Sequence, residues 1–149
     1  MAFARIARER VAPLLPPAEA ARLVAWLDAA VAEGFHDFTP VLVHADLGPE
    51  HLLVDPPTGH LRGVIDFGDS GTGDPAIDIA GALTALGEEA MPALLEAYDR
   101  PWDTALLQRA RRYRALGPLH EVLYGLDYGG AAFVESGLDG LRRRVFGGE

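Results

Sequence analysis

Only one stretch of this chain, residues 40–67, has the composition of β-strands, and helical patterns lie on both sides of it. Its apolar runs end at His44, at Asp55 and at Phe67. A polar loop separates the first run from the second, and the turn sequence Asp-Pro-Pro-Thr-Gly separates the second from the third. The pattern predicts one strand, a loop and a tight hairpin whose last strand covers Leu61 to Phe67. The whole chain is therefore predicted to be α+β and mostly helical, with a small β element.

The segments outside this stretch show the spacing of helices. Residues 3–33 are predicted to form two helices separated by Leu-Leu-Pro-Pro. Asp74 is a good helix cap before Pro75, and helices are predicted from there to about residue 146, with a bend at Gly117-Pro118. No internal repeat or low-complexity linker is visible, so residues 1–149 are expected to form a single domain.

The composition excludes several classes of protein. Hydrophobic residues make up 49% of the chain, which is too many for a disordered tail, and no apolar run approaches the roughly 20 residues that span a membrane. With no cysteine there is no disulfide scaffold, and with no clear signal peptide a cytoplasmic protein is expected. The formal charge of −9 disfavours nucleic-acid binding and is compatible with a cationic substrate or a divalent metal.

The titratable residues of the β stretch follow a definite order. His44 and Asp46 form an H-x-D sequence after the first apolar run, and His51 lies five residues beyond Asp46. Asp66 opens a D-F-G sequence at the end of the third run. Asp78 follows in the sequence Gly-Asp-Pro-Ala-Ile-Asp-Ile-Ala, one turn into the next predicted helix.

This order resembles the catalytic and metal-binding sequences of protein-kinase-like enzymes. It is most similar to the aminoglycoside phosphotransferase and choline kinase-like family, in which H-G-D-x-x-x-x-N-x-L-x-D is followed by G-x-I-D-[WF]-x-D and G-D-P-x-x-D-[LI]-A. The resemblance covers residues 40–82 strongly and the helical remainder only in character. It implies a kinase-like C-terminal lobe that transfers the γ-phosphate of ATP or GTP, held with Mg²⁺, to a hydroxyl of a small molecule such as an aminoglycoside, an amino alcohol or a sugar.

The resemblance also implies roles for individual residues. Asp46 is expected to be the catalytic base, because a carboxylate at a loop tip after a buried strand can accept a substrate proton. Asp66 and His51 are expected to bind Mg²⁺, which prefers oxygen ligands. His51 stands where the family usually has asparagine, and imidazole is a poorer partner for Mg²⁺, although the 2″-aminoglycoside phosphotransferases also carry histidine there.

Three further residues are expected to support the site. His44 would hold its loop through a hydrogen bond, and Asp78 would buttress the metal-binding loop. Asp69 would either line the acceptor site or be solvated. Four acidic residues of the later helices are candidates for binding a cationic acceptor, or plain surface: Glu121, Asp127, Glu135 and Asp139.

Two other enzymatic interpretations remain open from the sequence. Gly71 to Ala76 fits the dinucleotide-binding pattern G-x-G-x-x-[GA], with Glu96 as the ribose acid, but this needs a second parallel strand about 30 residues later. A metal-dependent hydrolase built on the histidines and aspartates of residues 44–66 is the other, and it leaves the D-F-G and G-D-P-x-x-D sequences unexplained.

A non-catalytic binding or remnant module is a third alternative, because two parts of a kinase-like enzyme are missing. Such an enzyme needs an N-terminal lobe of roughly 80 to 100 residues with a Gly-rich loop and a lysine for the phosphates. Only about 40 residues precede His44, they are predicted to be helical, and all 13 basic residues are arginine. The chain is therefore expected to be a C-terminal lobe alone, cut from a longer protein or gene. We expect it to be inactive by itself and to self-associate through the surface that the other lobe would cover.

Overall fold

A computed structural model describes residues 2–32, 38–99, 101–102 and 104–147. The chain divides into two compact units. Unit 1 consists of Met1–His36 with Ala115–Glu149, and unit 2 consists of Asp37–Arg114. Among the described residues, no helix is both long enough and apolar enough to cross a membrane.

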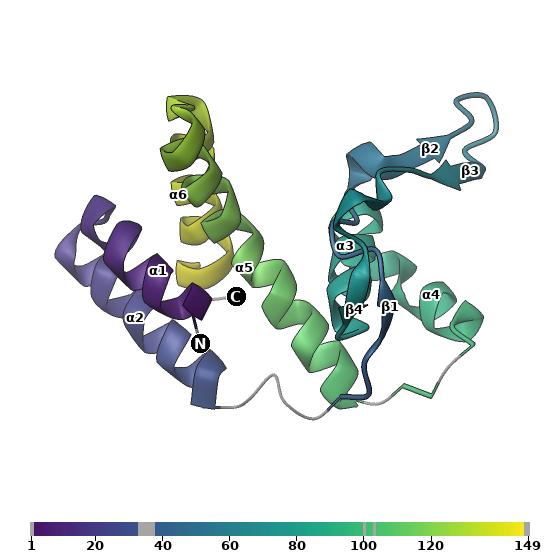
Figure 1. Cartoon of the computed structure of the whole chain (residues 1–149), viewed down its shortest axis with the longest axis horizontal. Coiled ribbons are helices and arrows are strands. Elements are labelled where there is room, and N and C mark those ends of the chain that lie inside the picture. Colours follow the sequence, from purple (N-terminus) through teal and green to yellow (C-terminus); the bar gives the residue numbers. More distant parts are fainter. Residues whose placement is uncertain (1, 33–37, 100, 103, 148–149) are drawn as a thin grey trace. The chain divides into compact units, whose positions relative to one another are not determined.

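Unit 1 is entirely helical in its described part (Figure 1). Its elements are α1 (Ala2–Arg10), a 3₁₀ turn (Ala12–Leu14), α2 (Pro17–Ala32), the C-terminal part of α5 (Thr104–Tyr128), α6 (Ala131–Leu141) and a π-helical turn (Arg142–Phe146). As predicted, two helices occupy the N-terminal region, and Pro17 opens the second. Leucines of α2 pack against α5 and α6 in a buried core that includes Leu23, Leu27, Leu119, Val122 and Leu141.

Unit 2 contains all four strands of the described chain (Figure 1). Its elements are β1 (Val41–Val43), β2 (Leu52–Val54), β3 (Leu61–Val64), β4 (Gly71–Gly73), α3 (Ala76–Leu86), α4 (Met91–Ala97) and the N-terminal part of α5, with short 3₁₀ turns at Pro49–His51, Phe67–Asp69 and Glu88–Ala90. α3, α4 and α5 bury a second apolar core that includes Ile79, Leu83, Met91, Leu106 and Ala110.

The strands form two separate antiparallel pairs. β2 and β3 make the predicted hairpin, with Leu52 opposite Val64. β1 pairs with β4, with Val43 opposite Gly71, so in the sequence the hairpin lies between the two strands of the other pair. The third strand ends at Val64 and not at Phe67 as predicted, because Asp66 has a left-handed backbone (φ 65°) and begins a 3₁₀ turn.

A buried ion pair links the start of α3 to α5 within unit 2. Arg109 donates from Nε to Oδ2 of Asp74 (2.8 Å) and from Nη2 to Oδ1 (3.2 Å), and the two side chains are 9% and 1% exposed. Asp74 Oδ1 also accepts the N–H of Ala76, which is the capping contact expected of this residue. α5 itself is continuous, and Pro118 lies inside it.

Candidate active site

The loop after β1 carries the predicted base. His44 is buried, whereas the Asp46 side chain is 59% exposed. Between them Ala45 has a left-handed backbone (φ 69°), an unfavourable conformation for a residue with a side chain. The chain therefore turns sharply at Ala45 and presents the Asp46 carboxylate to solvent.

Asp78 of α3 holds this turn. Its Oδ2 accepts the backbone N–H of His44 (2.8 Å), and its Oδ1 accepts that of Ala45 (3.0 Å). Hydrogen bonds from backbone N–H groups to a charged carboxylate are among the stronger ones in proteins. Asp78 was expected to support the metal-binding loop; it instead binds the loop that carries Asp46, because the start of α3 lies beside the end of β1.

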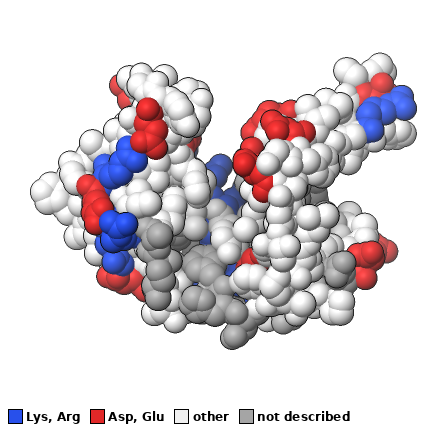
Figure 2. Space-filling view, viewed as in Figure 1, with Lys and Arg blue, Asp and Glu red and all other residues white. Residues whose placement is uncertain are grey.

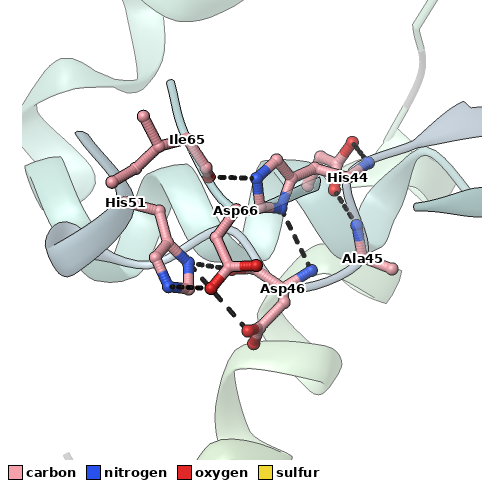
Figure 3. Close-up of polar contacts among 7 residues, drawn as sticks. His44, Ala45, Asp46, His51, Ile65 and Asp66 are labelled. Carbon is pink, nitrogen blue, oxygen red and sulfur yellow. Dashed lines mark hydrogen bonds and ion pairs between the residues drawn. The ribbon is translucent and has the colours of Figure 1, made fainter. Parts of the chain in front are cut away.

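The His44 side chain joins the two loops of the site (Figure 3). Its Nδ1 accepts the backbone N–H of Asp46 (3.3 Å), so the proton of the neutral ring lies on Nε2. That Nε2–H donates to the carbonyl of Ile65 (2.9 Å), next to Asp66. His44 thus fixes the loop that carries Asp46, residues 44–48 and called the base loop below, against the loop that follows β3.

His51 is held by a hydrogen bond from its Nδ1. Its Nδ1–H donates to the carbonyl oxygen of Asp46 (2.6 Å), and its own carbonyl accepts the N–H of Ile65 (3.0 Å). The bond to the Asp46 carbonyl raises the pKa of His51; partial burial opposes this, and the charges of Asp46, Glu50 and Asp66 add to it. In the neutral ring, the lone pair of Nε2 remains available.

The side chains of Asp46 and Asp66 both lie beside the ring of His51 (Figure 3). His51 Nε2 is 3.7 Å from Oδ2 of Asp66, and His51 Nδ1 is 4.0 Å from Oδ2 of Asp46. The Asp66 side chain is 64% exposed and that of His51 is 13% exposed. Acidic side chains gather on unit 2 at the base of the β2–β3 hairpin (Figure 2).

No group of three or more His, Cys, Asp or Glu side chains in the described part of the chain is arranged to hold a metal ion. The site offers two donors, Nε2 of His51 and a carboxylate oxygen of Asp66. Mg²⁺ commonly takes one or two protein ligands and completes its shell with water and phosphate oxygens. The lone pair of a neutral His51 also faces a carboxylate, an arrangement that a cation between them would stabilise. The donor set therefore fits a Mg²⁺ ion bound together with a nucleotide.

The other predicted residues are placed as follows. Asp69 is exposed at the end of the 3₁₀ turn after β3. Of the four candidate acceptor-binding acids, two are paired with arginines: Asp127 with Arg10 (2.6 Å) and Asp139 with Arg142 (3.0 Å). The hydrogen bond from Arg10 also lowers the pKa of Asp127.

Two contributions to the site were not predicted. Ile65 acts through its backbone, whose N–H and C=O bind His51 and His44, and residue type carries no signal for such a role. Gly81 of α3 lies against the backbone of Leu47, and the only signal was a glycine inside a helical pattern, three residues after Asp78.

The dinucleotide-binding alternative is wrong. Its first glycines, Gly71 to Gly73, form β4, which pairs antiparallel with β1. The segment around Glu96 belongs to the helix α4, and both sheets in the described residues are antiparallel pairs. A dinucleotide-binding unit requires parallel strands joined by a helix.

Solved structures identify the class of fold. The GDP complex of wild-type aminoglycoside 2'-phosphotransferase-IIIa matches 97% of this chain and 49% of that protein, with a TM-score of 0.81 and 22% identity. Macrolide 2'-phosphotransferase type I matches 91% of this chain and 44% of that protein, with a TM-score of 0.65 and 30% identity. The fold is therefore that of the kinase-like phosphotransferases, as the sequence predicted.

The family follows from the sequence matches. The model of the phosphotransferase enzyme family matches residues 2–116, and the chain belongs to this family, which includes the aminoglycoside phosphotransferases. Viomycin phosphotransferase of Streptomyces vinaceus is 30% identical over 142 residues, covering 94% of this chain and 48% of that protein. The chain thus spans about half the length of this relative and of the solved structures that it matches.

Proposed function

We propose that this chain supplies the catalytic lobe of an enzyme that transfers the terminal phosphoryl group of ATP or GTP to a hydroxyl of a small, cationic molecule. The observation that carries the proposal is the arrangement of Asp46, His51 and Asp66 around one point, at 3.7 and 4.0 Å from the His51 ring nitrogens. Phosphoryl transfer needs an oriented hydroxyl and cations on the phosphates, and little covalent chemistry from the protein.

Asp46 is the catalytic base or hydroxyl orienter in this proposal. Its carboxylate is exposed, so an acceptor can reach it, while its backbone is fixed on both sides. Its N–H binds His44 and its carbonyl binds His51, so the loop cannot turn without breaking one of these bonds. A base that is held in place and open to the substrate meets the geometric requirement of general base catalysis.

Asp66 is the principal ligand of Mg²⁺, and His51 is the secondary one. A carboxylate offsets the charge of the cation, whereas neutral imidazole does not. When bound, Mg²⁺ neutralises charge on the phosphates of the nucleotide. Because the carbonyl oxygen of Asp46 accepts the proton on Nδ1 of His51, the lone pair of His51 Nε2 faces Asp66. The same contact couples the position of the base to that of the metal ligand.

The proposed acceptor is a cationic small molecule such as an aminoglycoside. The formal charge of −9 and the acidic surface at the base of the hairpin support this class (Figure 2). Among the relatives, the names of viomycin phosphotransferase and of the aminoglycoside and macrolide phosphotransferases show that family members differ in acceptor. The acceptor is therefore to be found by a panel, with ATP and GTP tested separately as donors.

These 149 residues are proposed to be inactive alone. They contain no lysine, and the described residues before the site form no Gly-rich strand-loop-strand, so the β- and γ-phosphates lack the clamp on which positioning depends. A non-catalytic binding module is the alternative that this absence favours. Six apolar side chains in or next to the strands β1, β2 and β3 are 44–81% exposed, and we expect them to promote self-association of the isolated chain: Leu42, Leu53, Val54, Leu61, Ile65 and Phe67.

The experiment compares the isolated chain with a two-lobed protein. Residues 1–149 are purified alone, and are also joined to the nucleotide-binding half of viomycin phosphotransferase. Each is incubated with Mg²⁺, ATP or GTP, and a panel containing viomycin, kanamycin, a macrolide and choline, and phosphorylated product is measured by mass spectrometry. Product is expected only from the two-lobed protein, and only with Asp46 intact. Multiple turnover by residues 1–149 alone would show that no second lobe is required. A folded, nucleotide-binding two-lobed protein that phosphorylates nothing would favour the non-catalytic alternative.

A further inference from the structure

Helix α3 approaches the base loop more closely than a side chain would allow. A Cβ placed on Gly81 would lie less than 3.0 Å from three atoms of Leu47: its carbonyl oxygen, its carbonyl carbon and its Cβ. Two of these atoms are backbone, so the clash could not be relieved by a change of rotamer. Leu47 is the residue after Asp46, and the turn that follows it contacts α3.

A glycine at this place is otherwise unfavourable. Gly81 lies in the middle of α3 (Ala76–Leu86), where glycine destabilises a helix relative to alanine. Its backbone conformation is not left-handed, so the turn chemistry that usually calls for glycine does not apply. The close approach to Leu47 is the feature of the structure that requires it.

Gly81 and Asp78 act on the loop from the same face of α3. Residues three apart in a helix lie on one face, and Asp78 binds the backbone of His44 and Ala45 while Gly81 admits the backbone of Leu47. The helix therefore contacts the loop before and after Asp46. The backbone of Asp46 is therefore held by Asp78 on its N-terminal side and by the contact of Gly81 with Leu47 on its C-terminal side.

We propose that Gly81 is a positioning residue, whose missing side chain sets the location of the Asp46 backbone and, through the Asp46 carbonyl, the orientation of the His51 ring. A methyl group at position 81 would push Leu47 away from α3. The preceding carbonyl, which accepts the Nδ1 proton of His51 at 2.6 Å, would move with it. The base and the secondary metal ligand would then lose their relative placement together.

The importance of this placement for catalysis rests on the proposed function, but the placement itself has a signature that needs no catalysis. The structure puts the proton of neutral His51 on Nδ1 and that of His44 on Nε2. Nitrogen-15 NMR of the imidazole rings at a pH of about 8.5, where histidine is largely neutral, distinguishes these two forms. A failure of the phosphoryl-transfer assay would leave this measurement unaffected.

The test compares Gly81→Ala with two other helical glycines. Gly81→Ala is expected to lose the Nδ1–H form of His51 and to shift the amide resonances of residues 45–51. Gly137→Ala creates a similar clash, with Pro118 and Val122 in unit 1, and is expected to lower the urea midpoint while His51 keeps its Nδ1–H form. Gly117→Ala meets only Arg144 Nη1 at 3.7 Å and is expected to leave the Nδ1–H form of His51 unchanged.

Two results would overturn the proposal. One is a folded Gly81→Ala variant in which His51 keeps its Nδ1–H form; the other is loss of this form in Gly137→Ala as well, since that would make it a general effect of lower stability. If Gly81→Ala does not fold by circular dichroism, Asp78→Asn decides, because it weakens the hold of α3 on the loop without adding bulk. Retention of the Nδ1–H form of His51 in that variant would also refute the positioning role of α3.

Discussion

Replacing Arg109 by methionine should be among the most destabilising single changes in unit 2. The substitution removes both hydrogen bonds to the carboxylate of Asp74, at 2.8 and 3.2 Å, and leaves that carboxylate 1% exposed without its cation. Removing one partner of a buried pair costs about 3–5 kcal/mol, because the remaining charge is desolvated and uncompensated. Total stabilities are on the order of 5–15 kcal/mol, so the loss is a large part of the whole.

The assay is urea unfolding followed by circular dichroism. With a urea dependence of about 2 kcal/mol per molar, the midpoint should fall by about 1.5–2.5 M. Arg111→Met is the matched control, because Arg111 lies two residues away on α5 and its pair with Glu88 is exposed on both sides (57% and 48%), where such pairs contribute about 0–1 kcal/mol. Adding Asp74→Asn to Arg109→Met should recover part of the loss, since no buried charge then remains. Equal midpoints for Arg109→Met and Arg111→Met would refute the reasoning.

Three further predictions concern the site and its surroundings. In a two-lobed enzyme Asp46→Ala should lower kcat by at least about 10²-fold and leave nucleotide affinity nearly intact, and unchanged turnover would contradict its role as base. Calorimetry should show that Asp66→Asn weakens Mg²⁺-nucleotide binding more than His51→Ala does; the opposite ranking would reverse the assignment of the principal ligand. Burial, with the nearby charge of Asp74, raises the pKa of Tyr113 from 10.0 to about 12, so the folded state holds this proton more tightly than the unfolded chain. The stability gained in this way is present below pH 10 and is lost as the pH rises towards 12. Ultraviolet titration should show one late-ionising tyrosine that is missing from Tyr113→Phe, and identical titrations would show that the phenol is not perturbed.

The parts of the fold that sequence predicted are those specified locally. The hairpin followed from two apolar runs around the turn after Asp55, and helix starts followed from prolines such as Pro17. The order of Asp46, His51 and Asp66 predicted that these residues come together, and the structure has His51 beside both aspartates, although β1 and β3 belong to different sheets.

The parts that were missed depend on partners distant in sequence. β4 has the sequence Gly-Thr-Gly, which has little tendency to form a strand, and it forms one because β1 offers a partner. Asp74 was predicted only as a helix cap, and its buried ion pair depends on Arg109, 35 residues away. Asp66 has a left-handed backbone just after β3, which aspartate tolerates better than most residues, but the local sequence does not specify this conformation.

The discontinuity of unit 1 has a consequence for synthesis of the chain on the ribosome. α1 and α2 are made before unit 2, but Leu23 and Leu27 are buried against Leu119, Val122 and Leu141, which are made only after the whole of unit 2. At about 5–20 residues per second, residues 37–114 take on the order of 4–16 seconds to translate. During that interval the apolar faces of the first helices lack their partners, while the strands and helices that carry the site can already pair with one another. These two helices are therefore packed later than unit 2, which is made after them, and they are the segment that a chaperone would meet.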